Sequence, residues 1–66
     1  ELGPTEHAVL YVGTYELKFQ PEVPYKVVIN EAVELTKLYG ADGAYKLVNT
    51  VLDKIAKEIR SIEINA

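Results

Sequence analysis

An aromatic and basic cluster near the middle of the chain contains the residues best suited to contact a ligand. Tyr39 precedes Gly40, and Tyr45 and Lys46 follow Gly43. An aromatic ring beside a cation at the start of a helix can stack on a single-stranded base and hold its phosphate. The cluster therefore favours a nucleic-acid contact as one interpretation. The other is that these tyrosines pack at helix contacts, for which their amphipathic side chains are equally suited.

The remaining polar residues do not indicate a catalytic or metal site. His7 is the single histidine and the sequence has no cysteine, so a Cys/His cluster cannot form. Ser61 has no recognisable base partner. Glu31 and Glu34 share one helix face, but two acids without further ligands are better interpreted as a solvated surface. We therefore expect no enzyme activity, no cofactor and no metal.

The composition describes a small acidic chain. It has 66 residues, ten acids and seven bases, for a net charge of −3. No apolar run approaches the length of a membrane helix and no signal-peptide pattern is visible. With the lack of cysteine, this predicts a cytoplasmic chain without a membrane partner. Because nucleic-acid affinity needs clustered Lys and Arg, composition alone argues against RNA binding.

Three helical patterns would position these residues. Residues 6–19, 27–39 and 43–59 each carry apolar side chains at helical spacing. Residues 20–24, with two prolines, are the expected connector. Residues 61–66 have no clear period and are expected to fray. The central pattern is the clearest, with a stripe formed by Val28, Ala32, Leu35 and Tyr39.

Glycines mark where helices meet or end. Gly13 interrupts the first pattern, where Gly costs about 1 kcal/mol relative to Ala, so we expect a neighbouring helix to approach closely there. Gly40 is expected to be the left-handed residue that ends the central helix. Asp42 is expected to be the N-cap of the third helix.

Several blocks of sequence occur in an order and spacing that match a known family. They are EHAVL at 6–10, TYEL at 14–17 and VPYKVVINEAVEL at 23–35, followed by YGAD at 39–42. The run KLVNTVLDK at 46–54 compares with the motif K-F-V-N-G-V-L-D-K. Together these blocks resemble the NusB family of transcription antitermination proteins over nearly the whole chain.

The resemblance implies an all-α fold. NusB proteins are helical throughout and longer than this chain, and their N-terminal half carries an arginine-rich segment. The resemblance therefore implies that residues 1–66 are a three-helix C-terminal subdomain of the NusB-like fold, with that N-terminal half absent. The inner faces of such a subdomain would need a partner, either the missing half or a second copy, so self-association of the fragment is one expectation.

The resemblance also implies partners and site residues. In the family, NusB pairs with a small-subunit ribosomal protein, NusE, and together they bind the boxA element of nascent ribosomal RNA within the RNA polymerase antitermination complex. Tyr39 and Lys46 match RNA-contacting positions, and Glu6 matches an acidic position on the face that meets NusE. Leu47 matches an RNA-supporting position that is usually aromatic, and a leucine cannot stack on a base in the same way.

The sequence is also compatible with two other interpretations. NusB-like domains are also fused to ribosomal RNA cytosine methyltransferases, which typically read V-N-A-V-L-R. Asp53 stands at the last of these positions and favours the stand-alone protein. The other alternative is a helical scaffold fragment that self-associates and binds no RNA. Size in solution and an RNA titration would separate it from the antitermination interpretation.

Overall fold

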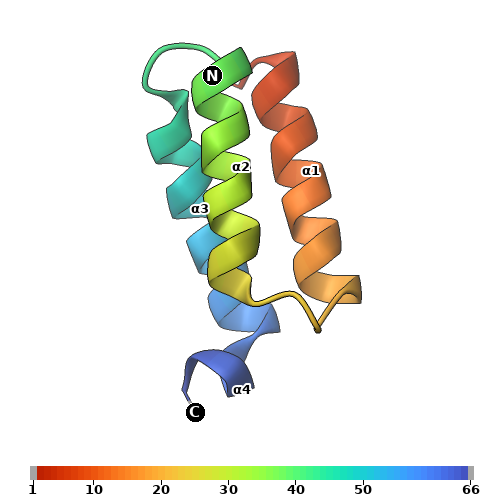
Figure 1. Cartoon of the computed structure of the whole chain (residues 1–66). Helices are drawn as coiled ribbons and strands as arrows, with labels where there is room; N and C mark the ends of the chain where they lie inside the picture. Colours follow the sequence, from red (N-terminus) through yellow and green to blue (C-terminus); the bar gives the residue numbers. More distant parts are fainter. Residues whose placement is uncertain (1, 66) are drawn as a thin grey trace.

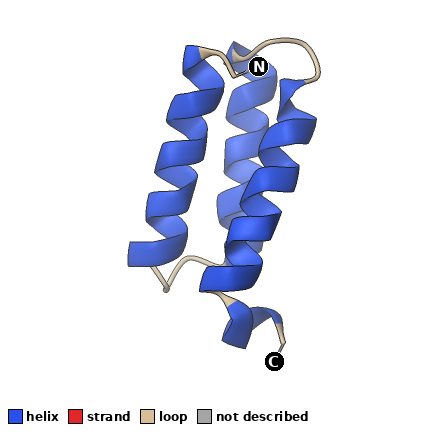
Figure 2. Cartoon of the chain, turned by 180° about the vertical axis from the view of Figure 1, so that it is seen from behind, coloured by secondary structure: helices blue, strands red, loops and turns tan. Residues whose placement is uncertain are grey.

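The described part of the chain folds into three long helices and one short helix. The computed structural model describes residues 2–65, with α1 at Pro4–Phe19, α2 at Tyr25–Tyr39, α3 at Ala44–Ile59 and α4 at Ser61–Ile64. The long helices run side by side in alternating directions (Figure 1). Seen from behind, the described residues form only helices and loops (Figure 2). The prediction of an all-α fold with three main helices is confirmed.

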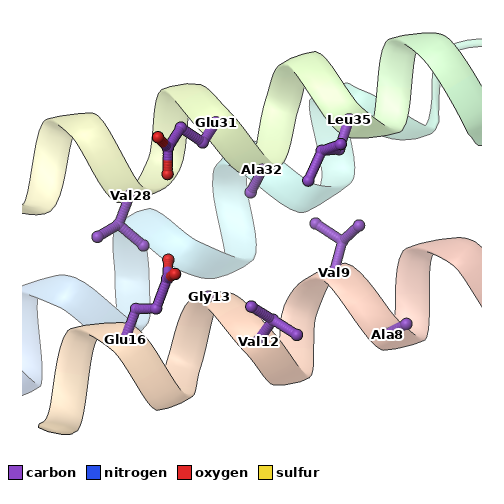
Figure 3. A pocket seen from close by; sticks show the side chains of 9 residues that line it. All are labelled: Ala8, Val9, Val12, Gly13, Glu16, Val28, Glu31, Ala32 and Leu35. Atoms are coloured by element: carbon purple, nitrogen blue, oxygen red, sulfur yellow. The ribbon is translucent and has the colours of Figure 1, made fainter. Parts of the chain in front are cut away.

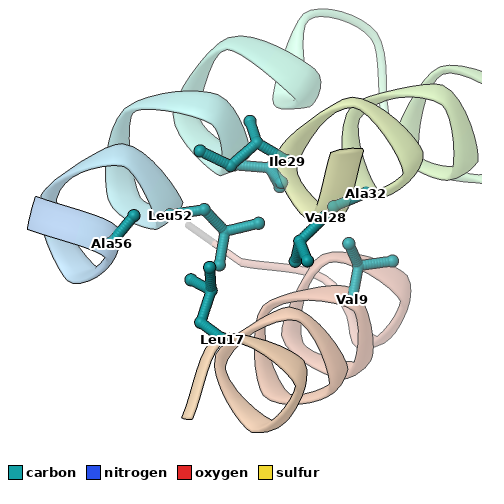
Figure 4. Close-up of a cluster of buried hydrophobic side chains, with 8 residues drawn as sticks. Val9, Leu17, Val28, Ile29, Ala32, Leu52 and Ala56 are labelled. Carbon is teal, nitrogen blue, oxygen red and sulfur yellow. The ribbon is translucent and has the colours of Figure 1, made fainter. Parts of the chain in front are cut away.

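All three long helices contribute to one apolar core. Val28 and Ala32, from the predicted stripe of the central helix, are buried as expected. Leu35 and Tyr39 are 46% and 72% exposed, because α2 turns its other flank, with Ile29 and Thr36, into the bundle. The core is drawn in Figure 4 and consists of Val9, Leu17, Val28, Ile29, Ala32, Val48, Leu52 and Ala56.

Helix α3 lies close to α1 at Gly13. A Cβ atom at this position would lie 3.0 Å and 3.1 Å from the two Cδ atoms of Leu52. Leu52 itself is fully buried, so it has little room to move away. The expectation that a neighbouring helix approaches at Gly13 is confirmed.

Gly13→Ala should lower the free energy of unfolding, although Ala is the better helix former. The reason is steric, so the same substitution should stabilise the protein once Leu52→Val has removed the Cδ atoms. Urea unfolding of the two single variants and the double variant would measure this cycle. A Gly13→Ala effect of the same sign and size in both backgrounds would show that Leu52 does not restrict this position.

The two glycines of the α2–α3 connection have roles different from those predicted. Gly40 is extended, with φ −94° and ψ −178°, so the expected left-handed cap is wrong. The positive φ, 77°, belongs to Gly43, which also replaces Asp42 as the N-cap of α3. The amide of Ala44 donates to the carbonyl of Ala41 at 3.1 Å. This closes a turn whose third residue has the φ and ψ of a type II turn, where glycine is favoured.

Ser61–Ile64 form the helix α4 and are not frayed as predicted, whereas Ala66 lies outside the described residues. Arg60, directly before α4, is buried with only 6% of its surface exposed. Its Nε donates to the carbonyl of Leu17 at 2.8 Å, Nη1 to that of Val23 at 2.8 Å and Nη2 to that of Gln20 at 2.9 Å. These carbonyls belong to the end of α1 and the following connector. The planar guanidinium thus bonds the carbonyl of Leu17 in the last turn of α1, which has no intrahelical partner, together with two carbonyls that follow the helix.

Glu63 links this arginine to the start of α2. One carboxylate oxygen, Oε1, accepts a hydrogen bond from Nη1 of Arg60 at 2.6 Å. The other, Oε2, accepts one from the amide of Tyr25 at 3.0 Å. Tyr25 is the first residue of α2, whose N-terminus favours a negative charge. The short α4 is therefore tied to both α1 and α2.

Candidate RNA-contacting end of the bundle

The three residues predicted to contact RNA lie around one turn. Tyr39 is the last residue of α2, and Lys46 and Leu47 lie in the first turn of α3. Figure 1 shows this turn at the end of the bundle where α1 begins. Tyr39 is 72% exposed and Leu47 is 43% exposed, and Lys46 is exposed as well. The structure thus brings the three residues to one end with their side chains accessible.

Tyr45 is less accessible to a ligand than its position in the sequence suggested. Its side chain is half-buried, and Nζ of Lys37 lies 4.9 Å from the centre of its ring. This cation–π contact occupies one face of the ring. It also brings Lys37 to the same end as Lys46. Sequence reasoning missed Lys37, and no local pattern singles it out, because it meets Tyr45 only through the packing of α2 against α3.

Glu6 lies at the same end but is buried, with 3% of its surface exposed. Its Oε2 accepts a hydrogen bond from the amide of Ala41 at 2.7 Å. The carboxylate fits between two glycines, since a Cβ atom would lie 2.6 Å from Oε1 at Gly3 and 2.5 Å from Oε2 at Gly40. Glu6 therefore fastens the first turn of α1 to the α2–α3 connection. Its predicted role at a protein interface stays a prediction.

Hydrogen bonds lower the pKa of two glutamates. For Glu6 the largest cause is the amide of Ala41, with further bonds from the amides of Glu6 itself and Gly3. For Glu63 the largest cause is the amide of Tyr25, followed by the Arg60 side chain. Each of these donors favours the ionised form. Both carboxylates are therefore charged at neutral pH, and both tie the ends of different helices together.

The free energy of unfolding should fall as the pH drops below about 4.5. The folded pKa values of Glu6 and Glu63 lie below the ordinary value of 4.5. Their stabilisation is therefore complete above that value and is lost as the pH falls through the folded pKa values. Urea unfolding over this acidic range should show that the free energy of unfolding depends less steeply on pH in the double variant Glu6→Gln/Glu63→Gln than in the parent. The exposed pair Glu22→Gln/Glu58→Gln should keep the parental slope; equal slopes in all three proteins would contradict the assignment.

Residues 2–65 contain no group of three or more His, Asp or Glu side chains that could hold a metal ion. None of the helices in this part of the chain is long and apolar enough to cross a membrane.

The comparison with protein families agrees with the sequence blocks. The sequence model described as NusB family matches residues 1–57. The chain belongs to the NusB family. The resemblance found in the sequence is thereby confirmed, and the all-helical fold is consistent with it. Among solved structures, none matches this chain.

Individual relatives carry the same family name. The chain is 62% identical over 56 residues to a protein of Actinobacillus succinogenes, covering 85% of this chain and 39% of the relative. It is 59% identical over 66 residues to one of Cupriavidus pinatubonensis and 56% to one of Azoarcus sp., covering 100% of this chain and 40% and 43% of those relatives. All three are named transcription antitermination protein NusB. This chain spans less than half the length of these relatives.

Proposed function

We propose that this chain is the C-terminal subdomain, residues 1–66, of a cytoplasmic transcription antitermination factor. In this proposal it binds boxA RNA together with the small-subunit ribosomal protein NusE within the RNA polymerase antitermination complex, and it is not an enzyme. The observation that carries the proposal is the identity of 56–62% to proteins named transcription antitermination protein NusB.

The exposed end of the bundle supports an RNA contact. The ring of Tyr39 is accessible for stacking on a base, which is worth about 1–3 kcal/mol per base. Lys46 would hold a phosphate beside the N-terminus of α3, whose dipole also favours negative charge. Leu47 would add an apolar contact without stacking. Lys37, which lies over Tyr45, is a second lysine at this end, although its Nζ is also 3.7 Å from Oε2 of Glu34.

The role of Glu6 in this function would be to hold the α2–α3 turn in position. Because the side chain is buried against the α2–α3 connection, it offers little surface to NusE directly. We expect it to act on partner binding by fixing the position of Ala41 and the residues around it. A positioning role of this kind would also affect the RNA contacts on either side of the same turn.

A fluorescence anisotropy titration with labelled boxA RNA and a scrambled RNA, with and without NusE, tests the proposal. We expect boxA to bind more tightly than the scrambled RNA when NusE is present. Tyr39→Ala should weaken boxA binding by about tenfold, as the loss of one stacked base predicts. Lys46→Ala should reduce the slope of log K against log salt by about 0.7, the contribution of one single-strand phosphate.

Lys54→Ala is the matched control, because Lys54 is an exposed lysine further along α3. Lys54→Ala should give a slope of log K against log salt close to that of the parent. If Lys46→Ala and Lys54→Ala reduced the slope and the boxA affinity equally, Lys46 would not be a specific RNA contact. Capture of NusE without any preference for boxA would contradict the RNA part of the proposal and leave a protein-docking scaffold.

A further inference from the structure

Helix α2 borders two grooves of different character. The groove between α1 and α2 is lined mainly by small and aliphatic side chains (Figure 3). The groove between α2 and α3 has a volume of about 360 Å³, and its lining includes two asparagines, a lysine and an aspartate. Cavities of about 150 Å³ accept a benzene-sized group. The α2–α3 groove therefore has room for a polar ring system larger than benzene.

The two asparagines approach the α2–α3 groove from different helices. Asn30 belongs to α2 and Asn49 to α3, and both residues are exposed. Within residues 2–65, the side-chain hydrogen bonds of the protein involve neither carboxamide. Each carboxamide thus keeps an acceptor, Oδ1, and a donor, Nδ2, for a ligand. Ile29 and Val33 line the same groove and offer an apolar surface to a flat ring.

Adenine is the nucleobase whose edges match two carboxamides. Its N6 amino group directs one hydrogen to the side of N7 and the other to the side of N1, and both ring nitrogens are acceptors. One asparagine can therefore pair with N6 and N7, the bidentate contact by which Asn recognises adenine, while the second pairs with N6 and N1. Cytosine has one such edge only, guanine presents two acceptors at O6 and N7, and uracil has no amino group.

The groove continues from the residue proposed to hold an RNA phosphate. Lys46 and Asn49 are three residues apart on α3 and so are neighbours on one face of the helix. Lys26, from α2, adds a positive charge to the lining. The acid of the lining, Asp53, is paired with Lys57 at 3.3 Å. A strand with a phosphate at Lys46 can therefore place a neighbouring base in the groove without meeting an unpaired acid of the lining.

We propose that the α2–α3 groove binds an adenine base of single-stranded RNA between Asn30 and Asn49. This inference rests on the RNA contact proposed for Tyr39 and Lys46, and it adds one base that is recognised by hydrogen bonds. Stacking on an aromatic ring and contact with a phosphate tolerate any base. The two asparagines would therefore give the site its preference for adenine.

Fluorescence anisotropy with labelled oligoadenylate, oligocytidylate and oligouridylate of equal length tests the proposal. Oligoadenylate should bind the parent protein most tightly, and 7-deazaadenine, which lacks N7, should weaken binding. Asn30→Ala/Asn49→Ala should weaken oligoadenylate binding about tenfold and leave the other two RNAs within about twofold, since stacking and phosphate contacts remain. Asn65→Ala is the matched control, because Asn65 is an exposed asparagine outside the groove. It should leave the affinity for all three RNAs unchanged.

NMR signals of the side-chain amides give a second readout that needs no variant. Oligoadenylate should shift the Nδ2 signals of Asn30 and Asn49 more than that of Asn65. Equal shifts on addition of an acetylated tetraglycine amide would overturn the proposal, because the groove would then recognise peptide groups in general.

The affinities separate failure of this inference from failure of the proposed function. If Tyr39→Ala weakened binding of all three RNAs but Asn30→Ala/Asn49→Ala bound oligoadenylate as tightly as the parent, the adenine site would be overturned and the RNA contact at the turn would stand. Equal affinity of the parent for the three RNAs would have the same meaning. If neither these RNAs nor boxA bound, both proposals would be overturned.

Discussion

Arg60→Ala should lower the free energy of unfolding by about 3 kcal/mol, a large part of the stability of so small a domain. The substitution removes a buried guanidinium that donates to the carbonyls of Leu17, Gln20 and Val23. The carbonyls of Leu17 and Val23 would lose these bonds, whereas that of Gln20 would keep the amide of Val23 at 3.0 Å. An unsatisfied polar group is costly where water cannot replace the bond. For a chain of this size the melting temperature should fall by roughly 10–25 °C.

Thermal and urea unfolding followed by circular dichroism would measure the effect. Arg60→Lys should fall between the parent and Arg60→Ala, because an ammonium cannot present donors in the planar fork that reaches several carbonyls. Lys57→Ala is the control, since Lys57 pairs with Asp53 on the exposed surface at 3.3 Å and such pairs contribute about 0–1 kcal/mol. An Arg60→Ala effect no larger than that of Lys57→Ala would show that the buried network is not important for stability.

Gly40→Ala should destabilise the fold by about 2 kcal/mol through overpacking. A Cβ atom there would lie 2.5 Å from Oε2 of Glu6 and 2.8 Å from the backbone carbonyl oxygen of Thr36. The Thr36 carbonyl is fixed because it accepts the amide of Gly40 at 2.8 Å. Relief would therefore require the α2–α3 turn to move away from Glu6. Urea unfolding would measure the loss of stability, and NMR shifts of the amides in the α2–α3 turn would measure its movement.

Gly43 provides the contrast, because nothing lies within 4 Å of a Cβ atom there and only its φ of 77° is unfavourable. Asn accepts this conformation better than Ala. Gly43→Asn should therefore cost less than Gly43→Ala, whereas Gly40→Asn should cost at least as much as Gly40→Ala. The opposite result, with Asn tolerated at 40 but not at 43, would mean that Gly40 has the left-handed conformation.

The helical pattern of the sequence was sufficient to predict the three long helices and part of the core. Val28 and Ala32 are buried as their spacing predicts, and Gly13 meets a neighbouring helix. Spacing could not show which flank of α2 faces α3, so Leu35 and Tyr39 were expected inside and are exposed. A wide apolar stripe predicts that a segment is helical, but which part of the stripe is buried depends on the helices that pack against it.

The candidate site shows the same division. Tyr39, Lys46 and Leu47 are close in sequence around one turn, so their common location followed from the chain itself. Glu6 is far from that turn in sequence, and its burial against Ala41 depends on the packing of α1 beside α2 and α3. Lys37 reaches Tyr45 for the same reason.

The helix periods, the connector between the first two helices and the family were all predictable from the amino-acid sequence. These depend on residues that are neighbours along the chain or one helical turn apart. The packed helices were needed to show that Arg60 and Glu63 hold one end of the bundle together and that Glu6 holds the other. They also show that Gly43, not Gly40, has the positive φ. Such hydrogen bonds join groups distant in sequence, and no local preference specifies them.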